Sequence, residues 1–130
     1  MTRNDKEYLF HLLQDIYFDN IDTAKADEAA EAMHNDVRWV HNQVWEHDAH
    51  KTNIRDTLNG RKEVREFLRK RIVEMQIEGI IHKVENVVSD GKLGAFKANV
   101  IGTDKSKKPF FGLVELKDDK IIYYRVLPQE

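Results

Sequence analysis

Tyr17 and His41 are the two residues of this sequence whose side chains best suit a proton-transfer site. An imidazole, with an ordinary pKa of about 6.5, accepts a proton near neutral pH, while a phenol stabilises negative charge that develops on an oxygen. Both residues also fit a structural role, because Tyr17 falls on the apolar stripe of an expected helix and His41 lies two positions after Trp39 on an expected strand. Catalysis and core packing therefore remain alternatives for this pair.

A polar segment from Gln43 to Asn59 shows no clear period, and we expect it to be a long loop. Trp45 in this loop is a candidate for a residue that folds over a bound ligand. Metal-binding residue types also gather near it, namely His41, Glu46, His47, Asp48 and His50. Their spacing matches no recognised metal motif, so we expect solvent-exposed side chains, no metal and no cofactor.

The composition is that of an ordinary globular chain, with 130 residues, 41% hydrophobic and 34% charged. This length predicts a single domain over residues 1–130. The absence of cysteine excludes disulfides, thiolate metal sites and thiol catalysis. A net charge of -2 gives no attraction toward nucleic acid, and the basic stretch from Arg61 to Arg71 is interpreted as a solvated helix face. No apolar run is long enough for a membrane span, and we expect a cytoplasmic protein.

Apolar spacing predicts three helices and five strands. Two helices come first, one along the stripe from Tyr8 to Ile21 and one from Ala26 to Met33, with turn and capping side chains at residues 20–23 between them. A strand begins at Asp36, and the third helix follows Gly60 and ends near Gly79. Four further strands are expected over residues 80–89, 92–103, 110–117 and 120–127.

The order ααβαββββ predicts an α+β fold, because the strands are grouped after helices and joined by short hairpin turns. We expect a curved antiparallel or mixed sheet wrapped around the three helices. Apolar residues on both faces of the last strands indicate that the outer face of the sheet is covered by a second copy, and a symmetric homodimer is predicted.

Four segments of the chain resemble the nuclear transport factor 2-like superfamily, and within it the SnoaL-like polyketide cyclase and ketosteroid isomerase branch. They are the run Tyr17-Phe18-Asp19-Asn20-Ile21-Asp22, the run Asn35-Asp36-Val37-Arg38-Trp39, the segment from Leu58 to Leu68, and the ending Asp119-Lys120-Ile121-Ile122-Tyr123-Tyr124-Arg125. The resemblance covers nearly the whole chain as one SnoaL-like domain. It implies a cone in which helices and a curved sheet surround a deep pocket, with a dimer on the outer face of the sheet. This fold hosts many reactions, so it does not select one.

The resemblance to ketosteroid isomerase places Tyr17 at the oxyanion tyrosine of that enzyme and His41 at its general base. The position of the isomerase's second oxyanion donor falls at Gly112, which has no side chain to donate a proton. We therefore do not expect steroid isomerisation by this two-donor route. The resemblance to epoxide hydrolases places their Arg and two Asp at Ala98, Val100 and Val126, which cannot activate water. A register slip of one residue would instead turn Lys97 and Asn99 toward the pocket.

The expected pocket is mostly apolar and aromatic, and suits a small hydrophobic or aromatic ligand. Its expected substrate-binding residues are Trp39, Trp45, Phe67, Ile122, Tyr124 and Val126. We expect a cofactor-free acid/base enzyme of the isomerase, dehydratase or cyclase type, in which His41 is the base and Tyr17 the polarising donor. A non-catalytic binding or interaction module and an accessory subunit of an oxygenase are the alternatives. The sequence does not name a substrate.

Overall fold

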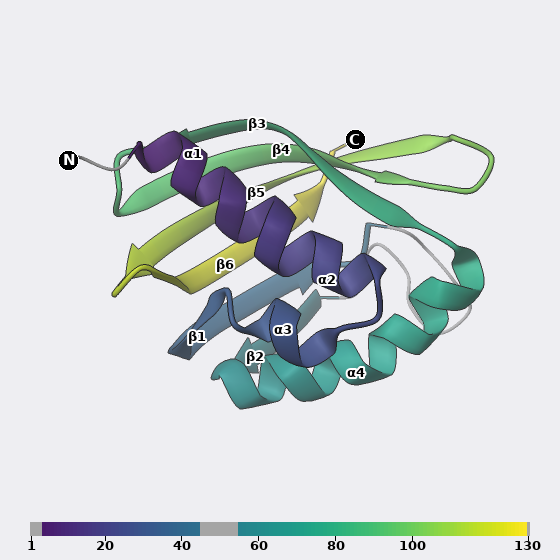
Figure 1. The fold of residues 1–130 in the computed structure, drawn as a ribbon, viewed down its shortest axis with the longest axis horizontal. Coiled ribbons are helices and arrows are strands. Elements are labelled where there is room, and N and C mark those ends of the chain that lie inside the picture. The colour runs from purple at the N-terminus through teal and green to yellow at the C-terminus, as the bar shows by residue number, and fades with distance from the viewer. Residues whose placement is uncertain (1–3, 45–54, 130) are drawn as a thin grey trace.

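The computed structural model describes residues 4–44 and 55–129, which form one curved six-stranded sheet with helices on its inner face (Figure 1). The strand order is β2-β1-β6-β5-β4-β3, and every neighbouring pair is antiparallel except β1 with β6, which is parallel. The strands are β1 (Met33–Asn42), β2 (Arg55–Asn59), β3 (Ile81–Ser89), β4 (Leu93–Ile101), β5 (Lys107–Lys117) and β6 (Lys120–Pro128). The predicted α+β fold with a mixed sheet is confirmed.

The first helical rod combines three segments, α1 (Asp5–Phe10), the π-helical η1 (His11–Phe18) and α2 (Asp19–Asp22). The junction residues all keep right-handed helical angles, so the rod continues without a break from Asp5 to Asp22. Two further helices follow, the short α3 (Ala26–Ala30) and the long α4 (Arg61–Glu78). The rod packs on β3 while α4 packs on β1 and β2, so the two enclose the inner face of the sheet (Figure 1). None of the described helices has the length and apolar composition to cross a bilayer.

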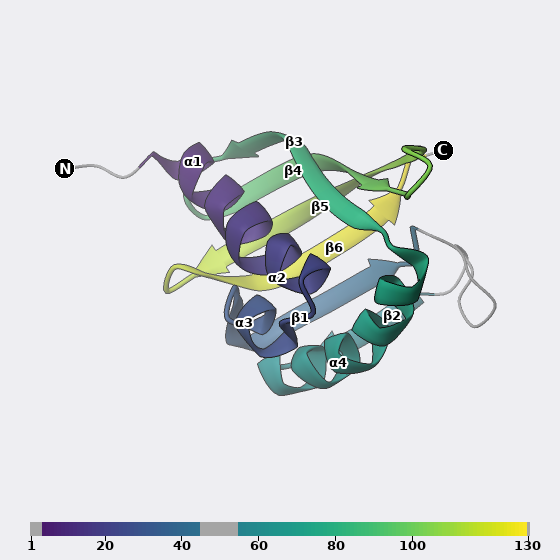
Figure 2. The same cartoon turned by 45° about the vertical axis from the view of Figure 1, so that its right-hand side comes forward.

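The core lies between the helices and the concave face of the sheet (Figure 2). The largest fully buried side chains come from both layers, and among them are Leu9 and Leu13 of the rod and Trp39, Phe110 and Tyr124 of the sheet. β-bulges between residues 33 and 38, 84 and 86, and 115 and 116 interrupt the strand register. Because bulges bend and twist strands, they help the sheet to wrap around the helices.

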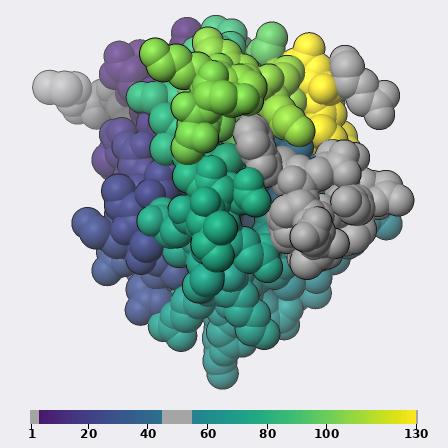
Figure 3. Space-filling view, turned by 90° about the vertical axis from the view of Figure 1, so that its right-hand side faces the viewer, coloured from purple at the N-terminus to yellow at the C-terminus, as the bar shows by residue number. Residues whose placement is uncertain are grey.

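Residues with positive φ lie where the sequence predicts the end of the third helix and the last hairpin turn. Gly79 adopts φ 70° at the end of α4, and its N–H donates to the carbonyl of Met75 over 2.8 Å. Asp118 and Asp119 both have positive φ in the hairpin between β5 and β6. A Cβ atom on Gly79 would lie 2.7 Å from the methyl group of Thr103, so α4 ends against the β4–β5 hairpin, as Figure 3 shows.

Two elements differ from the prediction. Residues 55–59, expected in a loop, form the edge strand β2, in which polar and exposed side chains hide the alternation that marks a strand. Met33, expected in the second helix, is fully buried in β1 and pairs with Ile121. The chain reaches β1 earlier because α3 ends at Ala30, and the bulge after Met33 breaks the period-two pattern that starts at Asp36.

Candidate functional site

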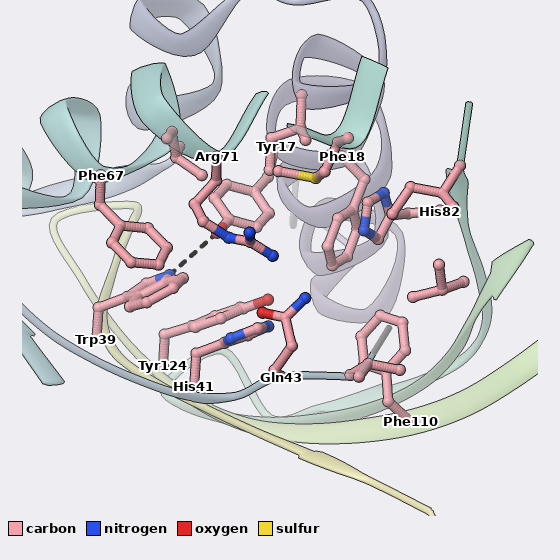
Figure 4. A pocket seen from close by; sticks show the side chains of 16 residues that line it. Tyr17, Phe18, Trp39, His41, Gln43, Phe67, Arg71, His82, Phe110 and Tyr124 are labelled. Carbon is pink, nitrogen blue, oxygen red and sulfur yellow. Dashed lines mark hydrogen bonds between the residues drawn. The ribbon is translucent and has the colours of Figure 1, made fainter. Parts of the chain in front are cut away.

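A hollow of about 50 Å³ lies between the helical rod, α4 and the sheet, and five of the predicted site residues line it. These are Tyr17, Trp39, His41, Phe67 and Tyr124. Figure 4 shows Trp39 and Phe67 on one side, Phe18, Phe110 and His82 on the other, and the polar ends of His41, Gln43 and Arg71 between them. The structure therefore brings the phenol of Tyr17 and the imidazole of His41 to the same hollow, as the sequence predicts.

Tyr17 is one of the most deeply buried polar residues of the hollow. It comes from the π-helical segment, a form of helix that is frequent at functional sites, and is 2% exposed. Its phenol oxygen accepts a hydrogen bond from Nε1 of Trp39 over 3.0 Å, and its ring packs beside that of Tyr124 with centroids 5.4 Å apart. Burial raises the pKa of Tyr17, because the charged phenolate would lose its hydration. Tyr17 thus stays neutral at physiological pH and keeps a proton to donate.

β1 positions Trp39 and His41 on one face of the sheet, where their rings stack with centroids 5.0 Å apart. Trp39 also stacks on Tyr124, its register partner on β6, with centroids 5.7 Å apart and planes 9° from parallel. The parallel pairing of β1 with β6 is therefore what aligns the three rings. Because aromatic stacks lose little entropy on ligand binding, they form a rigid wall for a flat ligand.

Arg71 of α4 is a pocket residue that the sequence analysis missed. It is 6% exposed and lines the hollow, which corrects its interpretation as part of a solvated helix face. Its guanidinium bonds Glu74, one turn along the helix, and the charge of Asp56 on β2 acts on it. Desolvation lowers the pKa of Arg71, and the charge of Asp56 opposes this effect. The signal was present, since Arg71 lies four residues after Phe67 and four before Met75 on the apolar stripe.

His82 at the start of β3 is a second pocket residue that was missed. Its Nδ1 lies 2.6 Å from Oδ1 of Asp22, and its backbone N–H donates to Oδ2 of the same carboxylate over 2.8 Å. Asp22 belongs to the segment expected to form a turn and cap the second helix. The structure instead continues the helical rod through Asp22, and α3 begins after Lys25 without a side-chain cap.

Two of the remaining predicted residues, Val126 and Ile122, lie outside the lining of the hollow. Val126 is fully buried in the core but does not line the hollow, and Trp45 lies outside the described residues. Ile122 lines a shallow surface hollow with Leu93 and Leu116. The bulge between Glu115 and Leu116 shifts the register of β6, so that Ile121, and not Ile122, joins the core with Tyr124.

Neighbouring strands confirm the inward register used for the epoxide hydrolase comparison. Ala98 and Val100 are buried in the core, whereas Lys97 is exposed. Gly112 also faces inward, because a Cβ atom there would lie 2.5 Å from the ring of Phe96. Val100 lines the hollow, whereas Ala98 and Gly112 lie in the core outside its lining, and none of the three supplies an acid, base or water-binding group.

The described residues contain no group of three or more His, Asp or Glu side chains that could hold a metal ion. His47, Asp48 and His50, the loop residues considered as metal ligands, lie outside the described ranges together with Glu46.

Comparison with known proteins shows the fold alone. No protein-family model matches the chain, and no curated protein matches its sequence. Solved structures match over nearly the full length. A ketosteroid isomerase-like protein of Kribbella flavida has 18% identity and a TM-score of 0.65, covering 97% of this chain and 81% of its own. An LEH-like epoxide hydrolase of M. tuberculosis has 15% identity and a TM-score of 0.67, with 97% of this chain and 86% of its own covered.

An NTF2-like protein of unknown function from Cytophaga hutchinsonii is also similar, with 8% identity, a TM-score of 0.63, and 99% and 93% of the two chains covered. The chain therefore has the nuclear transport factor 2-like fold, as its sequence segments indicate. Proteins of this fold include isomerases, epoxide hydrolases and proteins of unknown function, so the argument for an activity must come from the pocket itself.

Proposed function

We propose that this protein is a small enzyme that carries out cofactor-free acid/base chemistry of the isomerase, dehydratase or cyclase type on a hydrophobic or aromatic metabolite. The observation that supports it is the presence of Tyr17 and His41 in one aromatic hollow. His41 is the proposed base. Tyr17 is the proposed donor to the developing oxyanion, because its oxygen already accepts a bond from Trp39 and its own proton remains to be donated.

The size of the hollow narrows the way in which a ligand binds. About 50 Å³ holds a few water molecules, whereas pockets for whole metabolites commonly measure about 300–1,000 Å³. We therefore propose that only the reacting end of the substrate, a carbonyl or hydroxyl group with its neighbouring carbon, enters between His41 and Tyr17. Arg71 supplies a cation for an oxygen of that group.

Turnover of a panel of cyclic and aromatic ketones and hydroxyketones by wild-type protein tests the proposal, followed by His41→Gln and Tyr17→Phe with the best substrate. Loss of a general base lowers kcat by about 10²–10⁴-fold, and loss of an oxyanion donor by about 10²–10³-fold. Unchanged kcat in His41→Gln would remove His41 from the mechanism.

A non-catalytic binding module is the second candidate, favoured by the inert side chain of Val100 in the lining and by the lack of an acid or base at the core positions Ala98 and Gly112. It predicts that a compound from the same panel binds with a measurable heat and is recovered unchanged. The same calorimetry with Arg71→Met shows whether the binding uses this pocket.

The homodimer expected from the sequence remains a proposal for the outer face of the sheet. Phe111 and Leu113 of β5 are 43% and 56% exposed there, and Leu93 of β4 is 55% exposed nearby. Sedimentation equilibrium of the wild type and of Leu113→Lys tests it, since a buried lysine would dissociate the pair.

A further inference from the structure

The hollow contains a second imidazole, on the wall opposite Trp39 (Figure 4). His82 of β3 directs Nδ1 at Oδ1 of Asp22 over 2.6 Å, and the other carboxylate oxygen accepts the backbone N–H of His82 over 2.8 Å. The side chains of His82 and Asp22 are 11% and 10% exposed. One carboxylate thus fixes both the ring and the backbone of one histidine.

Neighbouring groups hold this imidazole in place. Phe18 stacks on the ring with centroids 5.0 Å apart and planes 10° from parallel, and Phe110 meets it edge-on at 6.4 Å. The amide of Gln14 donates to the carbonyl of His82 over 3.0 Å and accepts from the N–H of Val84 over 2.6 Å. The first residues of β3 are therefore hydrogen-bonded to the helical rod, and the packed ring is held in one orientation.

The pairing with Asp22 decides which nitrogen is available for chemistry. An ionised carboxylate only accepts hydrogen bonds, so Nδ1 must carry a proton. The remaining nitrogen, Nε2, then holds the lone pair in the neutral ring and the second N–H in the charged ring. An imidazole fixed in this way can take or give a proton at one defined atom.

A second His–Asp pair on the same rod shows what is special about this one. Nδ1 of His11 lies 2.9 Å from Asp15, but these side chains are 52% and 55% exposed on the surface. His11 lines none of the hollows described above. His11 also pairs with an aspartate, but it is exposed and lines none of these hollows, so it is a matched control for His82.

We propose that His82 is a second catalytic residue of the hollow, which donates its Nε2 proton to the substrate from the wall opposite His41, and that Asp22 is its positioning residue. The inference rests on the proposed acid/base function. His41 takes a proton from a carbon next to a carbonyl: the C–H bond breaks, its electron pair forms a C=C bond, and the C=O π pair moves to the oxygen. Protonated His82 then breaks its Nε2–H bond and gives this proton to carbon, where the C=C pair forms the new C–H bond while an oxygen lone pair restores the C=O bond. Water carries the proton from His41 back to His82, so no cofactor is consumed.

Hydrogen exchange of cyclopentanone in D₂O, followed by ¹H NMR, tests the proposal with a small ketone as probe. We expect the wild type to exceed an equal concentration of free imidazole, His82→Gln to lower the protein-catalysed rate at least about tenfold, and His11→Gln to leave it unchanged. A wild-type rate no greater than that of imidazole, or a His82→Gln rate equal to the wild type, overturns the proposal. Loss of exchange in His41→Gln alone would overturn the role of His82 while supporting that of His41. Loss of exchange in His82→Gln alone would support the role of His82 and overturn that of His41.

Nitrogen-15 NMR of the imidazoles gives a readout that does not depend on turnover or on the stability of a His82 variant. In the wild type we expect Nδ1 of His82 to give the signal of a protonated nitrogen, with the lone pair of the neutral ring on Nε2. In Asp22→Asn the preference for the Nδ1–H form should disappear. If the neutral imidazole of His82 in the wild type carries its proton on Nε2 and not on Nδ1, the assignment is contradicted.

Discussion

The indole N–H of Trp39 donates to the phenol oxygen of Tyr17 over 3.0 Å, and both side chains are 2% exposed. The bond joins the helical rod to β1, 22 residues later in the chain, and the ring of Tyr124 from β6 packs beside Tyr17 with centroids 5.4 Å apart. One side chain thus connects three elements around the hollow, so Tyr17 has a structural role whether or not it is catalytic.

Tyr17→Phe should lower the free energy of unfolding by about 1–3 kcal/mol, because it leaves the N–H of Trp39 buried without its acceptor. Urea denaturation followed by far-UV circular dichroism measures the change. Tyr8→Phe is the control, since its hydroxyl bonds the carbonyl of Asp119 at the surface, and we expect a loss below about 1 kcal/mol. Equal losses in the two variants would contradict the structural role of Tyr17.

Alkaline pH should destabilise the protein through its buried phenols. Burial raises the pKa of Tyr17 and of Tyr124 above the ordinary value of about 10. A raised pKa means that the folded state holds its protons more tightly, so this stabilisation is complete below pH 10 and is lost as the pH rises above 10. Absorbance at 295 nm should show two phenols that ionise only as the protein unfolds. Ionisation of all four tyrosines in the folded protein near pH 10 would refute this.

Arg71→Met should show whether the guanidinium serves ligand binding and turnover or mainly the stability of the fold. Glu74 is 41% exposed and keeps water contact, and the variant no longer buries a cation, so we expect the unfolding free energy to change by less than about 1 kcal/mol. Turnover or ligand affinity should fall about tenfold or more, the equivalent of one charged hydrogen bond. Arg69→Met is the control, because Arg69 pairs with Asp27 on the surface and should affect neither quantity. A loss of 3 kcal/mol or more in Arg71→Met would show that the residue is mainly structural.

Ile121 and Ile122 form a matched pair that tests the bulge in β6. Ile121 is fully buried, so Ile121→Ala should cost about 2–5 kcal/mol of unfolding free energy, whereas Ile122→Ala should cost less than about 1 kcal/mol. Thermal or urea unfolding of the two variants gives the comparison. The opposite ranking would restore the simple period-two arrangement of this strand.

The sequence predicted the elements whose residues follow one period without interruption. The stripe from Tyr8 to Ile21 placed Tyr17 on the correct face, and the alternation of Val37, Trp39 and His41 did the same for Trp39 and His41. Ile122 was misplaced because a bulge changes the phase of a strand without any residue type that marks it.

Residue type gave the wrong expectation where buried polar groups interact across the fold. Arg71 lies on the apolar stripe of α4, yet its charge suggested solvent, and its interaction with the charge of Asp56 on β2 depends on tertiary structure. His82 and Asp22 are 60 residues apart, so their contact also arises only from folding. Long-range pairs of this kind leave no spacing pattern in a single sequence.

The parallel pairing of β1 with β6 places residues from the first third of the chain beside residues from its last tenth. Trp39 cannot meet Tyr124 until translation has passed residue 124, so the aromatic wall of the hollow has to wait for nearly the whole of synthesis. A nascent chain stalled after β5 would expose Trp39 and Val114 without their partner strand. Such an intermediate is a natural client for a ribosome-associated chaperone.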